Sequence, residues 1–142
     1  MTLRFLLDTS TVSAATLAIP DESVLERLAV HEFECAIASV VWHELVFGYE
    51  RLQESHRKAE LSRFLFEVIR HLPILSYDER AAEWRGRERA RQAALGRPAP
   101  YVDGQIAAVA RTHELVLVTA NVKDFDGRFE GLRVENWRSA PA

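Results

Sequence analysis

Two kinds of hydrophobic pattern alternate along the chain. Short continuous apolar runs are typical of strands buried on both faces of a sheet, whereas apolar residues three or four positions apart are typical of amphipathic helices. The run at residues 115–119 is also rich in β-branched side chains, which favour strands. We predict strands at residues 4–7, 36–39, 73–75, 115–119 and 132–134.

Helical spacing fills the segments between these strands. Either Asp21 or Ser23 can cap a helix that starts after the break at Pro20. Gly96 and Pro98 are typical of the end of a helix. We predict helices over residues 12–17, 21–31, 41–52, 61–72, 78–95 and 103–113.

The alternation of strands and helices predicts βαβ units, and hence a mostly parallel sheet with helices on both faces. The expected fold class is therefore α/β, with three layers (α/β/α) around a central sheet of four to five strands. A length of 142 residues fits one domain, and we expect residues 1–142 to form it. In such a sheet the carboxyl ends of the strands and the amino ends of the following helices share one edge.

Composition and charge narrow the possible classes of protein. The net charge of −3 gives no overall signature of nucleic-acid binding, although it leaves room for a local basic patch. The start of the chain lacks the apolar core of a signal peptide, and no apolar run approaches the ~20 residues of a membrane span. The single Cys35 lies among apolar residues, which predicts a buried thiol in a reducing compartment. We expect a soluble, cytoplasmic protein without a membrane partner.

Three carboxylates stand where the pattern calls for apolar residues. Asp8 follows the first apolar run, Glu44 interrupts the apolar face of the helix over 41–52, and Asp103 precedes another apolar face. Burying one ionised carboxylate costs several kcal/mol unless something compensates its charge. Three such placements in one short chain indicate that a cation provides the compensation.

The predicted topology gathers these acids at one edge of the sheet. Asp8 ends the first strand, Glu44 lies just after the second, and Asn121 and Asp124 follow the fourth, into which the Asp103 helix leads. Ligand sets made only of oxygen suit Mg²⁺ or Mn²⁺. Such an ion activates water and stabilises charge at phosphorus, so the expected reaction is phosphodiester hydrolysis.

Other interpretations of these residues stay open. Asp8 and Asp103 could each cap the helix that follows, and Glu44 could pair with an arginine. A zinc-protease motif beginning at His43 fails because Phe47 stands where the second histidine belongs. A phosphoaspartyl enzyme using Asp8 would carry a second aspartate at position 10, where this chain has serine.

One basic block interrupts the acidic chain. Between residues 85 and 97, five arginines accompany one glutamate, so this block has a net charge of +4 and the rest of the chain −7. The block could contact an RNA backbone. It could equally be a solvated helix surface, with ion pairs Glu83–Arg87 and Glu88–Arg91 at helical spacing. The candidate RNA-binding residues are Arg85, Arg87, Arg89, Arg91 and Arg97.

Four segments of the chain resemble the PIN-domain nucleases, and in particular the VapC-like toxins of type II toxin–antitoxin systems. Each segment alone is weak, but their order and spacing together are specific, and the likeness runs from about residue 3 to Trp137. The segments are Leu6-Leu7-Asp8-Thr9-Ser10, Ser39-Val40-Val41-Trp42-His43-Glu44-Leu45-x-x-Gly48, Tyr101-x-Asp103-x-x-Ile106-Ala107-Ala108-x-Ala110 and Leu117-Val118-Thr119-x-Asn121-x-x-Asp124-Phe125.

The resemblance implies roles for individual residues. The three isolated acids match the family acids that bind Mg²⁺ or Mn²⁺, and Thr9 or Ser10, with Thr119, match polar residues that steady the site. Asn121 stands where many members carry a fourth acid, so the number of metal ions stays open, with Asp124 as an alternative ligand. The implied catalytic set is Asp8, Glu44, Asp103 and Asn121.

The resemblance also implies a function and partners. A Mg²⁺- or Mn²⁺-dependent endoribonuclease toxin would cut single-stranded or structured RNA, form a homodimer, and be blocked by a cognate antitoxin whose C-terminal segment fills a hydrophobic groove. Heterotetramers and larger assemblies with the antitoxin are expected. Leu52, Phe64, Leu65 and the apolar side of the first two helices are candidates for the partner surface, although core packing explains most of them as well. The alternative is a PIN-fold binding subunit of an antitoxin–DNA repressor complex, with little or no nuclease activity.

Overall fold

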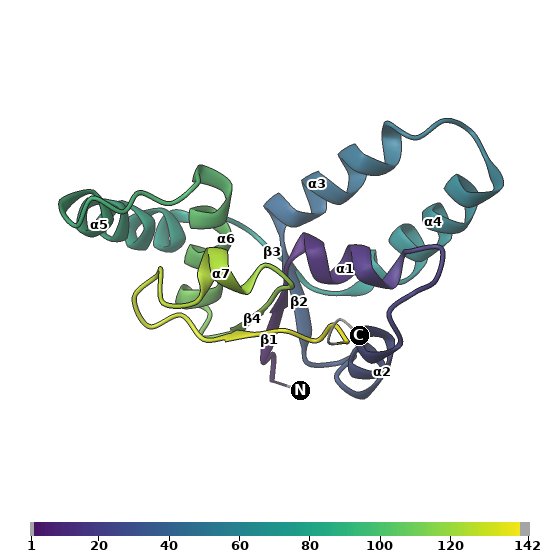
Figure 1. The fold of residues 1–142 in the computed structure, drawn as a ribbon, viewed down its shortest axis with the longest axis horizontal. Coiled ribbons are helices and arrows are strands. Elements are labelled where there is room, and N and C mark those ends of the chain that lie inside the picture. Colours follow the sequence, from purple (N-terminus) through teal and green to yellow (C-terminus); the bar gives the residue numbers. More distant parts are fainter. Residues whose placement is uncertain (1, 140–142) are drawn as a thin grey trace.

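A computed structural model describes residues 2–139 and contains a five-stranded sheet at its centre (Figure 1). Every neighbouring pair of strands is parallel, and the strand order is β3-β2-β1-β4-β5. The prediction of a mostly parallel sheet is confirmed. The strands are β1 (Phe5–Leu7), β2 (Cys35–Ala38), β3 (Ile74–Leu75), β4 (Val116–Val118) and β5 (Val134–Glu135).

Helices cover both faces of this sheet and complete the predicted three-layer α/β/α architecture. Figure 1 shows α1 to α4 on one side of the strands and α5 to α7 on the other. The helices are α1 (Thr9–Ala15), α2 (Glu22–Val30), α3 (Ser39–Glu50), α4 (His56–Glu67), α5 (Glu79–Ala94), α6 (Tyr101–Thr112) and α7 (Val122–Phe125), and a 3₁₀ turn, η1, spans Ile69–His71.

The starts of these helices follow from local capping chemistry. The Asp21 carboxylate accepts a hydrogen bond of 3.2 Å from the Val24 N–H, so Asp21 and not Ser23 caps α2. The helix predicted over 61–72 begins earlier, because the Ser55 hydroxyl caps it through the Lys58 N–H at 3.0 Å. That helix ends at Glu67, and the 3₁₀ turn takes up the rest of the predicted span.

The core is formed where the strands are hidden on both faces. All residues of β1 and β2 are buried, as their continuous apolar runs predict. Cys35 on β2 is a free thiol within this core, and burial raises its pKa to about 12, so the side chain behaves as a small hydrophobe. Within residues 2–139, no helix is long and apolar enough to cross a membrane.

The pairing of β1 with β4 sets the position of the edge that carries the acids. Leu7 is in register with Val118, and the Asp8 N–H donates to the Val118 carbonyl at 2.9 Å. The residues that follow the two strands, Asp8 and Thr119, are therefore neighbours although 111 positions separate them.

Candidate active site

Asp8 is the most enclosed acid of the edge, with only 6% of its surface exposed. It occupies the capping position of α1, yet its side chain accepts no hydrogen bond from the helix N–H groups. Its Oδ2 atom accepts instead from the Thr119 hydroxyl at 2.7 Å and from the Ser10 hydroxyl at 3.2 Å. The Asp8 side chain therefore does not cap α1 through a hydrogen bond, and the hydroxyls of Thr119 and Ser10 hold it instead.

The two hydroxyls that hold Asp8 belong to a small network joining β1 to the turn after β4. Ser10 Oγ and Thr119 Oγ1 lie 3.2 Å apart. The Ala120 N–H donates to the Ser10 hydroxyl, and the Asn121 N–H donates to the Thr119 hydroxyl, each at 3.0 Å. Because Thr119 is fully buried, this network fixes the orientation of the Asp8 carboxylate relative to the start of α7.

Glu44 lies half-buried on α3, which starts directly after β2 ends. Burial raises the pKa of its carboxyl, and the negative charge of Asp8 raises it further. His43 lowers it by a smaller amount. Within residues 2–139, no ion pair neutralises Glu44, so the structure excludes the arginine pair that the sequence left open.

Asp103 lies in the first turn of α6, three residues after the capping residue Pro100. The helix begins at Tyr101 after Pro100, earlier than the predicted start at residue 103, and so the capping interpretation is wrong here too. Burial raises the pKa of the Asp103 carboxyl to about 6, with further contributions from the charges of Asp8, Asp124 and Glu44. Asp103 is therefore close enough to three other predicted acids for their negative charges to raise its pKa.

Asn121 and Asp124 complete the edge in different ways. Both are exposed, and Asn121 precedes α7 without capping it through its side chain. Asp124 on α7 acts on Asp103 more strongly than Glu44 does. Of the two candidates for the fourth ligand, Asp124 is therefore the one that adds negative charge to the site.

The residues of this edge fit a divalent cation. Their donor atoms are all oxygens, and the raised pKa values of Glu44 and Asp103 report negative charge without a balancing partner. The buried Thr9 hydroxyl also lacks a hydrogen-bond partner among residues 2–139. In the same part of the chain, no group of three or more His, Cys, Asp or Glu side chains is placed so that it could hold a metal ion. Mg²⁺ keeps several waters and takes only one or two carboxylates, so it does not require such a group.

An apolar hollow adjoins the acids on the α3 side. Its volume is about 230 Å³, and Thr9 and Glu44 line it together with Leu45, Tyr49 and Leu61. Of the predicted partner surface, Leu52 is 42% exposed, Phe64 is half-buried, and Leu65 lines the hollow while being only 1% exposed. Leu65 thus belongs mainly to the core, as the packing interpretation proposed.

The arginine block does not form one surface. The predicted pairs Glu83–Arg87 and Glu88–Arg91 are both present, at 3.5 Å and 2.6 Å. Arg85 is only 6% exposed, and it donates to the buried Gln92 side chain at 3.4 Å. A buried guanidinium cannot reach an RNA backbone, so the prediction of RNA contact is wrong for Arg85.

The structure adds one residue that the sequence did not single out. Arg128, in the turn after α7, is the positive charge that lowers the pKa of Asp103. It stands alone in the sequence, two residues after Asp126, and no spacing rule relates it to the basic block. Only the packing of α6 against α7 brings it to the acidic edge.

Comparison with known proteins agrees with this architecture. The PIN domain family matches residues 5–128. The chain is 36% identical to the tRNA(fMet)-specific endonuclease VapC of Shigella flexneri, over 95% of this chain and 98% of that protein. It is 30% identical to ribonuclease VapC2 of Haemophilus influenzae over the same shares of the two chains.

Solved structures show the same fold. The DNA-bound VapBC structure from Salmonella typhimurium matches with a TM-score of 0.82 and 33% identity, over 95% of this chain and 98% of that one. VapBC2 from Rickettsia felis, bound to a promoter DNA fragment, matches with a TM-score of 0.80 and 27% identity over 96% and 99%. The chain belongs to the PIN domain family.

Proposed function

We propose that this protein is a metal-dependent endoribonuclease, the toxin of a toxin–antitoxin pair. The observation that carries the proposal is the group of acids at the sheet edge, in which burial and the charges of Asp8, Asp124 and Glu44 raise the pKa of Asp103 to about 6. A structural role alone would favour pairing such acids with cations of the protein. The relatedness to VapC ribonucleases adds the class of substrate.

Each acid has a proposed role. Asp8 and Asp103 would hold a Mg²⁺ or Mn²⁺ ion, and Glu44 would bind the same ion or orient the attacking water through its carboxylate. The ion would supply positive charge for the scissile phosphate and for the attacking oxygen. Asp124 and Asn121 would complete the site from α7. Thr119 and Ser10 act through Asp8, because their hydroxyls fix its carboxylate.

RNA is the proposed substrate, and transfer RNA is the first kind to test. The Shigella flexneri relative is described as specific for tRNA(fMet), and a relative from Salmonella typhimurium with 35% identity carries the same description. At such identity the active-site chemistry can be shared while the choice of RNA differs. We therefore propose initiator transfer RNA as a hypothesis within the wider class of RNA.

The proposed partner is a cognate antitoxin. The solved structures named above are VapBC assemblies, in which a toxin and an antitoxin occur together. The apolar hollow beside Glu44 is open to a hydrophobic segment, and a segment lying there would cover the acids. We also propose that the toxin forms a homodimer, and heterotetramers or larger assemblies with its antitoxin.

The direct test is cleavage of RNA by antitoxin-free protein. Purified protein is incubated with total RNA and with an initiator transfer RNA transcript, in Mg²⁺ or Mn²⁺, and new RNA ends are mapped. We expect discrete ends that disappear in EDTA and with Asp8→Asn. Retention of cleavage by Asp8→Asn at the same ends would show that the acidic edge is not the active site.

The second candidate function is a DNA-bound repressor subunit without nuclease activity. It is favoured by the DNA present in two structures similar to this chain. Folded, antitoxin-free protein that leaves every RNA intact in both metals, yet strengthens promoter binding by its antitoxin, would support this alternative and remove the proposed nuclease function.

A further inference from the structure

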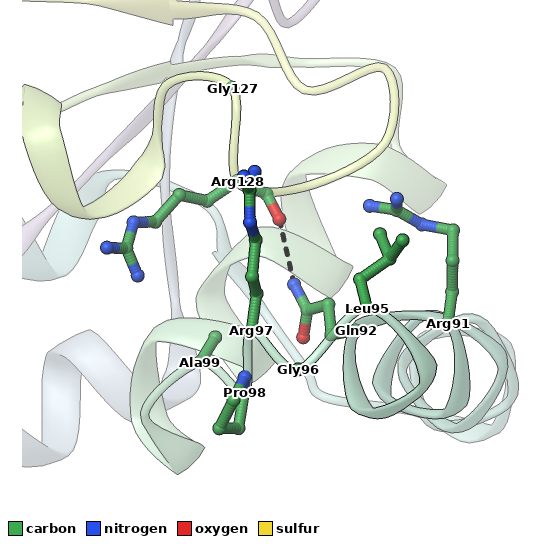
Figure 2. Close-up of a pocket in the computed structure, with 9 residues that line it drawn as sticks. All are labelled: Arg91, Gln92, Leu95, Gly96, Arg97, Pro98, Ala99, Gly127 and Arg128. Atoms are coloured by element: carbon green, nitrogen blue, oxygen red, sulfur yellow. Dashed lines mark hydrogen bonds between the residues drawn. The ribbon is translucent and has the colours of Figure 1, made fainter.

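A second hollow, of about 390 Å³, lies on the other side of the sheet from the apolar one. It is formed by the C-terminal end of α5, the segment that follows it and the turn after α7 (Figure 2). Binding pockets for small molecules start at about 300 Å³, so the space suits one nucleotide of a longer strand. None of the nine residues drawn around it in Figure 2 is acidic, and three are arginines: Arg91, Arg97 and Arg128.

These three arginines differ in whether their guanidinium groups already have an ion-pair or hydrogen-bond partner within the protein. Arg91 is bound by Glu88 at 2.6 Å and 2.9 Å, and its Nε lies 3.9 Å from Glu130. The guanidinium groups of Arg97 and Arg128 have neither an ion pair nor a hydrogen bond to any residue between 2 and 139. Their positive charge is therefore available to an anion.

The backbone that carries the two free arginines is firmly held. Gln92, only 2% exposed, donates from its side chain to the Arg128 carbonyl at 2.8 Å, and its own carbonyl accepts from the Arg97 N–H at 2.8 Å. The buried Glu88 carboxylate accepts from the Glu130 N–H. Buried polar groups of α5 thus fix both walls of the hollow, which reduces the conformational entropy that binding would cost.

The arrangement of the head groups favours a strand over a single small anion. In Figure 2 the Arg97 side chain reaches up between Arg91 and Arg128, and the side chains of those two lie on opposite sides of it. A small anion is best held by donors that converge on it, whereas separated arginines suit successive backbone phosphates.

Of the three arginines in the hollow, Arg128 lies toward the acidic edge of the sheet. Arg128 follows α7, which packs against α6, the helix that carries Asp103. A strand that crosses the hollow and passes Arg128 therefore continues toward the acids. We propose that the hollow between α5 and the turn after α7 binds backbone phosphates of the RNA strand beside the scissile bond, through Arg97 and Arg128. This inference rests on the proposed function, since it places the RNA of that reaction.

Binding without cleavage tests the proposal. A short fluorescein-labelled single-stranded RNA is titrated with Asp8→Asn protein in EDTA, and anisotropy gives Kd over a series of KCl concentrations. We expect Arg97→Ala and Arg128→Ala each to raise Kd by about 3- to 10-fold, and to reduce the slope of log K against log[salt] by about 0.7 per lost phosphate contact. The matched control is Arg63→Ala, because Arg63 is exposed on α4 and does not line the hollow.

Two further measurements keep the result interpretable. Thermal unfolding of each variant checks the fold, and Arg97→Lys and Arg128→Lys, which keep the charge, should recover most of the lost affinity. If the Arg97 and Arg128 variants bind RNA as Arg63→Ala does, the hollow is not the phosphate site and the inference is overturned.

A failure here is distinguishable from a failure of the proposed function. Wild-type protein that binds RNA through Arg97 and Arg128 but does not cut it in Mg²⁺ or Mn²⁺ upholds the inference and defeats the nuclease. Wild-type protein that cuts RNA, but whose RNA affinity does not change when either arginine is replaced, upholds the nuclease function and overturns the inference about the hollow.

Discussion

Glu88 on α5 and Asp103 on α6 are enclosed carboxylates in neighbouring helices, and the protein treats their charges in opposite ways. Glu88 is only 4% exposed, and although burial raises its pKa, hydrogen bonds from Arg91 and the Glu130 N–H outweigh burial and lower it overall. Asp103 is less buried, yet burial and the charges of other acids raise its pKa to about 6.

The difference separates a charge that the protein pairs from charges that it leaves without a cationic partner. The Glu88 network gives each charge a partner, and it ties α5 to the turn after α7. The acids at the sheet edge have no cationic partner between residues 2 and 139 besides the influence of Arg128 on Asp103 and of His43 on Glu44. The first arrangement contributes stability, and the second stores electrostatic repulsion that a bound cation would relieve.

The comparison predicts that removing Asp8 abolishes activity without unfolding the protein. Asp8→Asn keeps the size of the side chain and removes the charge proposed to hold the metal. We expect RNA cleavage to fall by about 100-fold or more. The check is single-turnover cleavage with excess protein, alongside a urea unfolding curve. If Asp8→Asn lost much stability but kept full activity per folded molecule, Asp8 would have a structural role and not the proposed role in catalysis.

Removing Glu88 should have the opposite effect, costing stability first. Glu88→Ala leaves Arg91 and the Glu130 N–H without their partner, so the free energy of unfolding should fall by about 2–3 kcal/mol. Urea unfolding at pH 7 measures this change. The matched control is Glu83→Ala, whose exposed pair with Arg87 should change stability by less than about 0.5 kcal/mol. Equal losses in the two variants would contradict the structural role of Glu88.

Thr119 is a smaller test of the same acidic edge, because its hydroxyl contacts Asp8 and no other acid of the site. Thr119→Val removes the 2.7 Å hydrogen bond to Asp8 and the acceptor of the Asn121 N–H. Loss of such support around a metal ligand typically costs about 10-fold or more in activity or metal affinity. We expect a raised metal requirement, which titration of cleavage against Mn²⁺ would show. Thr119→Ser, which keeps the hydroxyl, should restore the wild-type requirement.

Asp103 should lower the stability of the metal-free protein at neutral pH. Its pKa is about 6 when folded against 3.8 ordinarily, so the folded state binds more protons between those values, and stability falls as pH rises through them. After a reduction for partial exposure, Asp103→Asn should raise the free energy of unfolding by about 1 kcal/mol at pH 7 in EDTA, and by little below pH ~4.

The measurement is urea unfolding at both pH values, repeated with saturating Mg²⁺. Bound cation should stabilise the wild type, and the advantage of Asp103→Asn should shrink or reverse. A variant less stable than wild type in EDTA at pH 7 would show that Asp103 is already neutralised within the protein.

Patterns confined to a few neighbouring residues were enough to predict much of the fold. Continuous apolar runs marked the three inner strands, β1, β2 and β4, because strands covered on both faces admit few polar side chains. The acids that broke those patterns pointed to one edge, because parallel βαβ units place strand ends together. The ion pairs of α5 also followed from spacing alone, because helical geometry fixes side-chain neighbours within one turn.

Other features depended on contacts between distant segments, which no local pattern encodes. Arg85 turns inward beneath α6, where Gly104 has no side chain: a Cβ built at that glycine would lie 1.9 Å from the Arg85 Nε. Asp8 is held by Thr119 from β4 and does not cap its own helix, since the β1–β4 register places a hydroxyl beside it. The sequence by itself determined the inner strands, the helices between the strands apart from the short α7, and the acids at the strand ends. Only the tertiary structure decided which arginines are buried, which are paired and which face a hollow, because side-chain partners are chosen by packing between elements far apart in the chain.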